Sequence, residues 1–327
     1  MKTVAFAGVT TGFGLTVLRE FFISGADKKY KLILLSRSAQ PEWSAKGADV
    51  RPVNYNNHAQ LVESLRGVHT ILSFIGGSTD GIRDSQKAII VAAKEAGVTR
   101  FAPSEFAGSS YDGIDLYKPK SELFDFVKSS GLEYTRFSCG LFTNILATGT
   151  TKPVTSRGEA EGCKSGEEEA LAGLRPWNYV VNMKAGTADL PSDGNAKMAM
   201  TDMRDVARFT IAALDLETWP EELGMRGDVT TFREIVSVLE KVQGRKFLIR
   251  ENSVEEMEKM IEADPTTTFY NQTRINLSQD WGLVPDNLNK LFPDIKPITM
   301  EEFVECWWTD VDLPEPSWQQ DTIFAIR

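Results

Sequence analysis

The sequence predicts an α/β fold in which a doubly wound parallel sheet is followed by a smaller, helix-rich C-terminal domain. Two patterns support this prediction. In residues 1–150, short apolar runs with the length of buried strands alternate with amphipathic helical segments, as in parallel sheets with right-handed crossovers. In residues 151–327, helical periodicity dominates. We therefore place a domain boundary near residue 150, and we expect some later elements to pack back on the first domain.

The expected elements of the first domain follow one another in a regular order. Strand patterns lie at residues 3–7, 31–38, 48–53, 70–74, 100–102 and 134–138. Helical patterns lie at residues 15–22, 59–65, 82–96 and 121–129. Gly97 and Gly131 each follow a helical stretch, where glycine is a frequent helix stop.

Three closely spaced glycines separate the first strand from the first helix. Gly8, Gly12 and Gly14 give the spacing G-x-x-x-G-x-G, which differs from the common G-x-G-x-x-G fingerprint. A strand, a glycine turn and a helix in this order allow backbone N–H groups to hold a dinucleotide pyrophosphate. The alternative is a tight turn that binds no ligand. The second strand pattern, at the distance expected in a βαβ unit, favours a Rossmann-type dinucleotide-binding domain.

The end of the second strand indicates which dinucleotide is bound. NAD sites usually carry an acidic residue there, about twenty residues after the glycines, to bind the ribose 2′-hydroxyl. This chain has Ser36 and Arg37 instead, and the next acid is Glu42. A guanidinium can pair with a 2′-phosphate, whereas a carboxylate would repel it. We therefore expect NADP(H), with an ordinary surface arginine as the alternative.

Composition excludes several other functions. The chain has 327 residues, a net charge of −10 and no basic block, which disfavours nucleic acids and anionic membranes as partners. Three widely spaced cysteines indicate a reducing compartment, so we expect a cytoplasmic protein without a membrane span. His58 and His69 lack the spacing of metal ligands or of a catalytic triad. The oligomeric state stays open, a homodimer included.

The second domain begins with a polar stretch. Residues 150–174 are rich in glycine and glutamate, which favours a solvated flexible loop, with a mobile lid over the active site as the alternative. Residues 202–216 and 231–242 carry the apolar stripe of amphipathic helices. Ser253 and Thr299 each precede a glutamate by three residues, the spacing of a capping box at a helix start.

A dinucleotide fold does not by itself define a reaction. The commonest companion of a G-x-x-x-G-x-G turn is a Tyr-x-x-x-Lys pair, in which the lysine lowers the tyrosine pKa for proton transfer. None of the seven tyrosines has a lysine four positions later. A proton donor of another kind is therefore needed.

Several segments resemble one family. Residues 99–106 read Thr-Arg-Phe-Ala-Pro-Ser-Glu-Phe, Lys120 opens the next helical stretch, and Gly131 begins the run Gly-Leu-Glu-Tyr-Thr. In these segments the chain resembles the NmrA-like family of atypical short-chain dehydrogenases/reductases, in particular the isoflavone reductase and phenylcoumaran benzylic ether reductase group. The family usually has glycine where this chain has Thr11. Gly12 supplies the flexibility one position later, which implies that the cofactor binds on an altered turn.

The resemblance assigns roles to individual residues. Lys120 takes the position of the catalytic lysine, which exchanges a proton with a substrate oxygen while NADPH delivers hydride; Lys118 is the competing candidate. A lysine with apolar walls can have a pKa low enough for this work. The residues placed at NADP(H) are Gly8, Thr10, Thr11, Gly12, Phe13 and Gly14 at the pyrophosphate, Arg37, then Ser73, Phe74, Ile75 and Gly76 on the adenosine and ribose side, and Lys120, Ser138, Cys139 and Gly140 at the nicotinamide. Phe74 and Ile75 are almost equally good core residues.

These observations predict an NADPH-dependent reductase of a small aromatic or other secondary-metabolite substrate. One alternative is a redox sensor that binds the dinucleotide without turnover, and another is an epimerase or dehydratase that retains its cofactor. Lys120 favours the reductase, because sensors of this family tend to lack the lysine. Four tryptophans are candidates for lining an aromatic substrate pocket or for packing in a core: Trp177, Trp307, Trp308 and Trp318.

Overall fold

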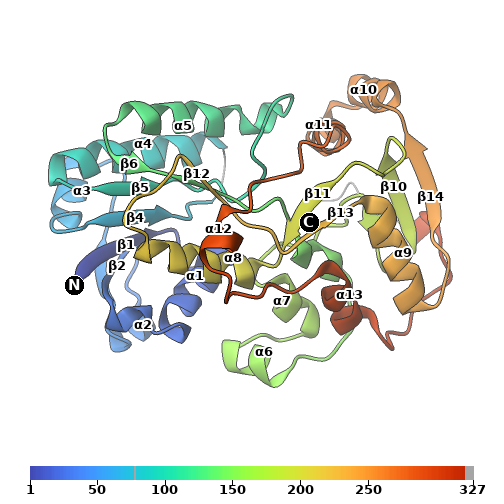
Figure 1. Cartoon of the computed structure of the whole chain (residues 1–327), viewed down its shortest axis with the longest axis horizontal. Coiled ribbons are helices and arrows are strands. Elements are labelled where there is room, and N and C mark those ends of the chain that lie inside the picture. Colours follow the sequence, from blue (N-terminus) through green and yellow to red (C-terminus); the bar gives the residue numbers. More distant parts are fainter. Residues whose placement is uncertain (77–78, 321–327) are drawn as a thin grey trace.

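Six parallel strands form the largest sheet in the computed structural model, which describes residues 1–76 and 79–320 (Figure 1). Their order is β3-β2-β1-β4-β5-β6, the strand order of a Rossmann sheet. The strands are β1 (Lys2–Ala7), β2 (Tyr30–Ser36), β3 (Asp49–Pro52), β4 (Thr70–Ser73), β5 (Arg100–Ala102) and β6 (Glu133–Tyr134). The predicted doubly wound parallel sheet is confirmed.

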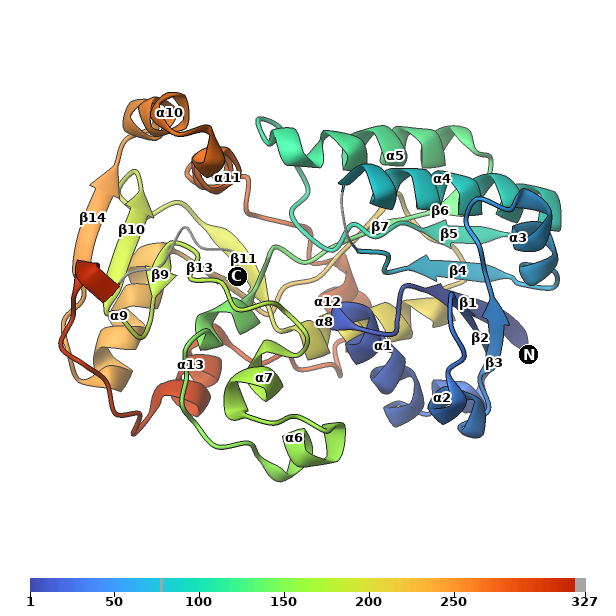
Figure 2. The same cartoon turned by 180° about the vertical axis from the view of Figure 1, so that it is seen from behind.

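Helices cover both faces of this sheet, because side chains alternate between the faces along each strand (Figures 1 and 2). In β1, Val4 and Phe6 belong to the core on one face, and Ala5 and Ala7 to the core on the other. The first face is covered by α1 (Gly12–Ile23), α2 (Pro41–Ala45) and α8 (Met203–Ala212). The second face is covered by α3 (His58–Ser64), α4 (Thr79–Ala96) and α5 (Lys118–Ser129).

The predicted single strand over residues 134–138 is divided in two. β6 stays in the main sheet, whereas β7 (Arg136–Ser138) pairs with β12 (Glu222–Gly224) from the second part of the chain. The Arg136 guanidinium forms an ion pair with Glu222 at 2.8 Å, between the two strands. β7 is therefore paired with β12, a strand from the second part of the chain that the strand pattern of the first part does not predict.

A second core is built from two small sheets and the helices beside them, mainly from the second part of the chain, although β8 (Leu141–Phe142) and residues 145–147 of this core precede residue 150. One sheet contains β9 (Val181–Asn182), β10 (Thr187–Pro191) and β14 (Leu248–Asn252), and the other contains β8, β11 (Met198–Thr201) and β13 (Asp228–Thr230). The later helices are α9 (Phe232–Gln243), α10 (Val254–Ala263), α11 (Thr268–Leu277), α12 (Asn287–Leu291) and α13 (Met300–Trp308). The capping boxes predicted at Ser253 and Thr299 are confirmed, and Thr231 makes a third.

Elements from the second part also complete the first core. Val206 and Phe209 of α8 are fully buried against α1, and Leu214 and Trp219 follow them into the same core. The first core therefore draws on both sides of residue 150. In the described part of the chain, no helix has the length and apolar character that a membrane span requires.

The polar stretch at residues 150–174 is not the flexible loop that its composition favours. It contains α6 (Ser156–Glu161) and α7 (Gly166–Leu171), which are capped by Thr155 and Ser165. The three glutamates lie in the first turn of α7, where negative charge stabilises a helix. One of them, Glu169, is 3% exposed and accepts hydrogen bonds from the backbone N–H and the hydroxyl of Thr155 at 2.7 and 2.6 Å. The acidic run is therefore a packing element.

Candidate active site

The glycine turn brings the ends of β1 and β4 into close contact. Gly8 has φ +80°, and a Cβ atom there would stand 2.7 Å from the backbone nitrogen of Ile75. Gly14 is equally constrained, because a Cβ would stand 2.4 Å from the carbonyl oxygen of Gly8. Thr11 is extended, with φ −151°, whereas Gly12 has φ +60°. The positive φ of this turn therefore falls on Gly12 and not on Thr11.

A cleft of about 1050 Å³ opens above this turn, at the carboxyl ends of the strands. No side chain caps the N-terminus of α1 and no acidic residue lies in its first turn, so this end of the helix suits an anion. The expected residues that line the cleft are Gly8, Thr10, Thr11, Gly12, Phe13, Gly14, Arg37, Phe74, Ile75, Gly76 and Lys120. Eleven of the fifteen expected residues therefore line one cavity.

Four expected residues do not line this cleft. Ser73, Ser138 and Cys139 are at most 1% exposed and lie within the core behind it. Gly140 lines a neighbouring cavity instead, and a Cβ there would stand 2.1 Å from the carbonyl oxygen of Ala199 in β11. Phe74 serves both expected roles, since it lines the cleft and stacks on Phe106 with ring centroids 5.3 Å apart.

Arg37 lines the cleft directly after β2. The Ser36 hydroxyl donates to the Ser38 carbonyl at 2.7 Å, which closes the turn around Arg37. The Arg37 side chain is exposed and makes no ion pair with any residue that the structure describes. Tyr55 lines the cleft nearby; burial raises its pKa, and the charge of Arg37 opposes this shift. This corner offers a free cation beside an aromatic ring.

Lys120 also lines the cleft, from the first turn of α5. Its Nζ donates to the carbonyl oxygens of Ser104 and Glu105 at 2.9 and 2.8 Å. A protonated amine has three N–H donors, so one remains for a ligand. Lys118, the competing candidate, is exposed and pairs with Asp115 at 2.6 Å. Only Lys120 of the two reaches the cleft.

Burial lowers the pKa of Lys120 from its ordinary value, and the charges of Glu105 and Cys139 oppose this shift. The Nζ atom also lies 5.7 Å from the ring centroid of Tyr111 and 5.5 Å from that of Tyr117. The faces of these rings favour a cation. Lys120 therefore stands in an environment that adjusts a lysine for proton transfer.

A second, smaller cavity of about 110 Å³ adjoins the Lys120 end of the cleft. The two share Tyr117 and Ala107. Six aromatic residues line it, four of them from the second part of the chain: Tyr111, Tyr117, Trp177, Tyr179, Phe269 and Trp281. This volume is of the same order as, and smaller than, that of the dry apolar cavity of about 150 Å³ that holds benzene in another protein.

The four candidate tryptophans have different positions. Trp177 lines the aromatic cavity and stacks on Phe269, with ring centroids 6.0 Å apart. Trp307 and Trp308 are 7% and 0% exposed in the second core. Trp318 packs against the Arg250 guanidinium at 4.7 Å. Trp281, which the sequence interpretation did not select, also lines the cavity.

Sequence reasoning missed the contribution of the segment after α7 to the cofactor cleft. Arg175 lines the cleft, and Gly173 packs directly on Gly12. The Thr16 hydroxyl of α1 donates to the Ala172 carbonyl at 2.8 Å. One signal was present in the sequence: Ser165 precedes Glu168 by three residues, the capping-box spacing, which indicates a helix inside the polar stretch.

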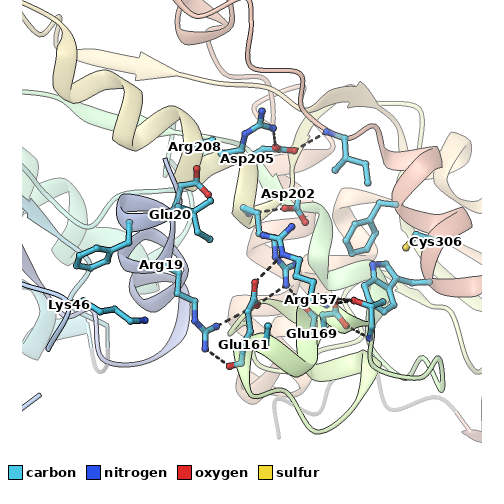
Figure 3. Close-up of a pocket in the computed structure, with 18 of the residues that line it drawn as sticks. Arg19, Glu20, Lys46, Arg157, Glu161, Glu169, Asp202, Asp205, Arg208 and Cys306 are labelled. Atoms are coloured by element: carbon cyan, nitrogen blue, oxygen red, sulfur yellow. Dashed lines mark hydrogen bonds and ion pairs between the residues drawn. The ribbon is translucent and has the colours of Figure 1, made fainter. Parts of the chain in front are cut away.

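Another cavity, of about 900 Å³, is lined by residues of α1, α6, α7 and α8, and Lys120 is not among its lining residues (Figure 3). Glu161 lies at its centre and pairs with Arg19, Arg157 and Arg204 at 3.5, 3.0 and 3.2 Å. The Arg19–Glu161 pair joins the two parts of the chain. Among the described residues, no group of three or more His, Cys, Asp or Glu side chains could hold a metal ion.

Comparison with known proteins gives a consistent assignment. The model of the NmrA-like family matches residues 1–304. The chain is 27% identical over 255 residues to oxidoreductase BOA1 of Botryotinia fuckeliana, covering 76% of this chain and 78% of the relative. It is 26% identical over 274 residues to phenylcoumaran benzylic ether reductase TP7 of Nicotiana tabacum, with the same two coverages, 76% and 78%.

Solved structures share the fold. AtPrR2 with NADP⁺ and (+)-pinoresinol is similar with a TM-score of 0.71 at 20% identity, covering 94% of this chain and 98% of that chain. The complex of leucoanthocyanidin reductase with NADPH from Vitis vinifera is similar with a TM-score of 0.69 at 19% identity, covering 93% and 99%. At these identities the likeness concerns the fold, and the chemistry has to be argued from the site.

Proposed function

This chain belongs to the NmrA-like family, and from that premise we propose that it is an NADPH-dependent reductase of a small aromatic secondary metabolite, with Lys120 as the proton donor. The observation that carries the proposal is the position of Lys120. Two of the N–H donors of its Nζ are held by backbone carbonyls. The amine lies beside Tyr117, which lines both the cleft and the aromatic cavity.

The residues of the cleft fit NADP(H). The uncapped N-terminus of α1 and the glycine turn suit the pyrophosphate, and Arg37 suits the 2′-phosphate. Arg175 adds a second exposed cation from the far side of the cleft. The bound nicotinamide would supply the hydride. Two similar solved structures are complexes with NADP⁺ and NADPH, which supports this cofactor.

Each protein group then has a defined task. The Ser104 and Glu105 carbonyls hold Nζ so that its third proton points to a ligand oxygen. Tyr117, Trp177 and Phe269 bind an aromatic ring beside it and exclude water. Lys120 donates its proton to the oxygen on which negative charge develops when the substrate is reduced. A positioned acid of this kind contributes roughly 10²- to 10⁴-fold to the rate.

The cysteines support a reducing compartment. Cys139, Cys163 and Cys306 are all free thiols. We therefore assign the enzyme to the cytoplasm, where thiols stay reduced.

The test is NADPH oxidation by the purified protein with a panel of aromatic ketones, imines and benzylic ethers. We expect turnover of at least one class, and Lys120→Met lowers kcat by about 10²-fold or more while the NADPH dissociation constant changes little. Lys118→Met is the matched control and retains turnover. Tight NADPH binding without turnover across the panel would contradict the proposal and favour the redox sensor.

A further inference from the structure

The Glu105 carboxylate is an unusual group in the wall of the cofactor cleft. The residue is 2% exposed, and neither carboxylate oxygen has a hydrogen-bond partner of standard geometry among the described residues. Buried carboxylates without such partners are rare, because the loss of hydration is costly. Burial raises the pKa of Glu105, and the Lys120 charge, Tyr111 and the Arg136 charge oppose this shift and favour the ionised carboxylate.

Glu105 and Lys120 are also joined through the backbone. The Lys120 Nζ donates to the Glu105 carbonyl oxygen at 2.8 Å, so the amine is held on the very residue that carries the buried carboxylate. The Ser104 N–H donates to the Gln86 side chain of α4 at 2.8 Å, which fixes the loop that presents both carbonyls. The loop therefore holds the Lys120 amine through the Glu105 backbone, and the Glu105 carboxylate is buried on the same residue.

The other polar groups around this pair keep one charge state through the working pH range. Burial raises the pKa of Cys139 to about 12 and that of Tyr117 to about 12, and it holds the pKa of Tyr111 well above its ordinary value of 10. Arg136 is a permanent cation paired with Glu222 at 2.8 Å. Burial raises the pKa of Glu105 and lowers that of Lys120, so within the described surroundings these are the two groups whose pKa values burial moves toward neutral pH.

We propose that Glu105 is a positioning residue for Lys120: its carbonyl anchors the amine, and its buried carboxylate is the counter-charge that keeps the amine protonated. The inference rests on the proposed role of Lys120 as proton donor. Burial alone would drive a lysine toward the neutral form, which cannot deliver the proton of an ammonium. A nearby carboxylate opposes that effect and keeps the acid competent at higher pH.

The sign of the effect can be tested with Glu105→Gln, which keeps shape and removes charge. The charge of Glu105 opposes the effect of burial on the pKa of Lys120. Without that charge, the pKa of Lys120 falls. We expect the alkaline limb of the kcat/KM profile to move to lower pH by about one pH unit, with the NADPH dissociation constant little changed. Glu105→Asp retains the charge and should restore much of the wild-type profile.

A second readout follows Lys120 without turnover. In protein labelled with ¹³C-lysine, the Lys120 Cε signal, assigned by its loss in Lys120→Met, should titrate at lower pH in Glu105→Gln than in the wild type. Glu169→Gln is the matched control, since Glu169 is another buried carboxylate, hydrogen-bonded to Thr155 and absent from the cofactor cleft. It should leave the Lys120 titration unchanged.

The two readouts separate this inference from the proposed function. An identical Lys120 titration in wild type and Glu105→Gln would overturn the role of Glu105, even with Lys120→Met inactive. A shifted titration together with full turnover by Lys120→Met would uphold the charge coupling and reject Lys120 as the proton donor. If kcat/KM of Glu105→Gln fell by the same factor at every pH, with no shift of the alkaline limb along the pH axis, that result would also contradict the inference.

Discussion

Gly173, which follows α7, lies directly against Gly12 of the glycine turn: a Cβ atom on Gly173 would stand 2.7 Å from the Gly12 carbonyl carbon. The Thr16 hydroxyl closes the same contact by donating to the Ala172 carbonyl at 2.8 Å. The turn that is expected to hold the pyrophosphate is thus shaped by a segment about 160 residues later in the chain. Cofactor binding and the packing of the second part of the chain are coupled at this point.

Gly173→Ala should weaken cofactor binding. The added methyl displaces the glycine turn, and φ +95° at Gly173 adds strain of about 1–2 kcal/mol for a residue with a side chain. We expect the dissociation constant for NADPH to rise roughly tenfold, about 1.4 kcal/mol, by fluorescence titration. Gly47→Ala is the control, because Gly47 has φ +97° but nothing within 4 Å of the added atom. Equal affinities in the two variants would show that the contact does not shape the site.

Arg37→Ala should reduce the preference for NADPH over NADH. A charge-assisted hydrogen bond to a phosphate is worth about 1.5–3 kcal/mol, so the ratio of the two dissociation constants should fall roughly 10- to 100-fold. Arg175 lines the cleft elsewhere, and Arg175→Ala should weaken both cofactors alike. Calorimetric titration with NADPH and NADH measures both ratios. An unchanged ratio in Arg37→Ala would remove this residue from the 2′-phosphate site.

Local patterns were sufficient for the first part of the fold. The apolar runs that become β1, β2 and β4 are buried on both faces, so their hydrophobic signal is continuous and strong. The glycine turn and Arg37 could also be predicted from the sequence, because residues that directly follow the first two strands have defined positions at the dinucleotide in this fold. Lys120 needed the family resemblance, since a lysine in a first helical turn is usually solvent-exposed.

Features that depend on distant contacts could not be read in this way. Glu105 reads as a surface residue until the fold buries it beside Lys120. The pairing of β7 with β12 joins segments 86 residues apart, as the Arg136–Glu222 hydrogen bond shows. The average composition of residues 150–174 predicts a loop. The two residues that cap the helices formed there, Thr155 and Ser165, are a local signal that composition does not include.

Asp189→Asn should destabilise the second part of the chain. Asp189 and Arg274 are both 0% exposed and pair at 3.2 Å, and Arg250, Asn252 and Tyr270 donate to the same carboxylate at 2.7, 2.8 and 3.0 Å. Neutralising the carboxylate leaves the buried Arg274 guanidinium without a counter-charge. Breaking a buried pair in this way costs about 3–5 kcal/mol in free energy of unfolding, measurable by urea denaturation.

The same carboxylate gives stability a defined pH dependence. Although burial raises the pKa of Asp189, hydrogen bonds and the charges of Arg250 and Arg274 hold it below its ordinary value of 3.8. A depressed pKa adds stability above the unfolded-state pKa, and this stability is lost as pH falls through the folded-state pKa. Wild type should therefore lose its advantage over Asp189→Asn below about pH 4. Asp286→Asn removes an exposed pair with Lys290 and should cost less than about 1 kcal/mol at any pH.

Trp177→Ala should separate substrate binding from cofactor binding. Trp177 lines the aromatic cavity, stacks on Phe269 and has its ring centroid 4.7 Å from that of Tyr179, whereas it does not line the cofactor cleft. Its truncation enlarges the cavity and removes a face for ring stacking, worth about 0.5–1.5 kcal/mol beyond the buried area. For an aromatic substrate identified by the NADPH oxidation assay, we expect KM to rise roughly tenfold or more, with KM for NADPH unchanged. Trp318→Ala, which removes a ring packed on Arg250 outside the cavity, should alter neither constant. A rise in KM for NADPH alone would place the substrate ring somewhere other than this cavity.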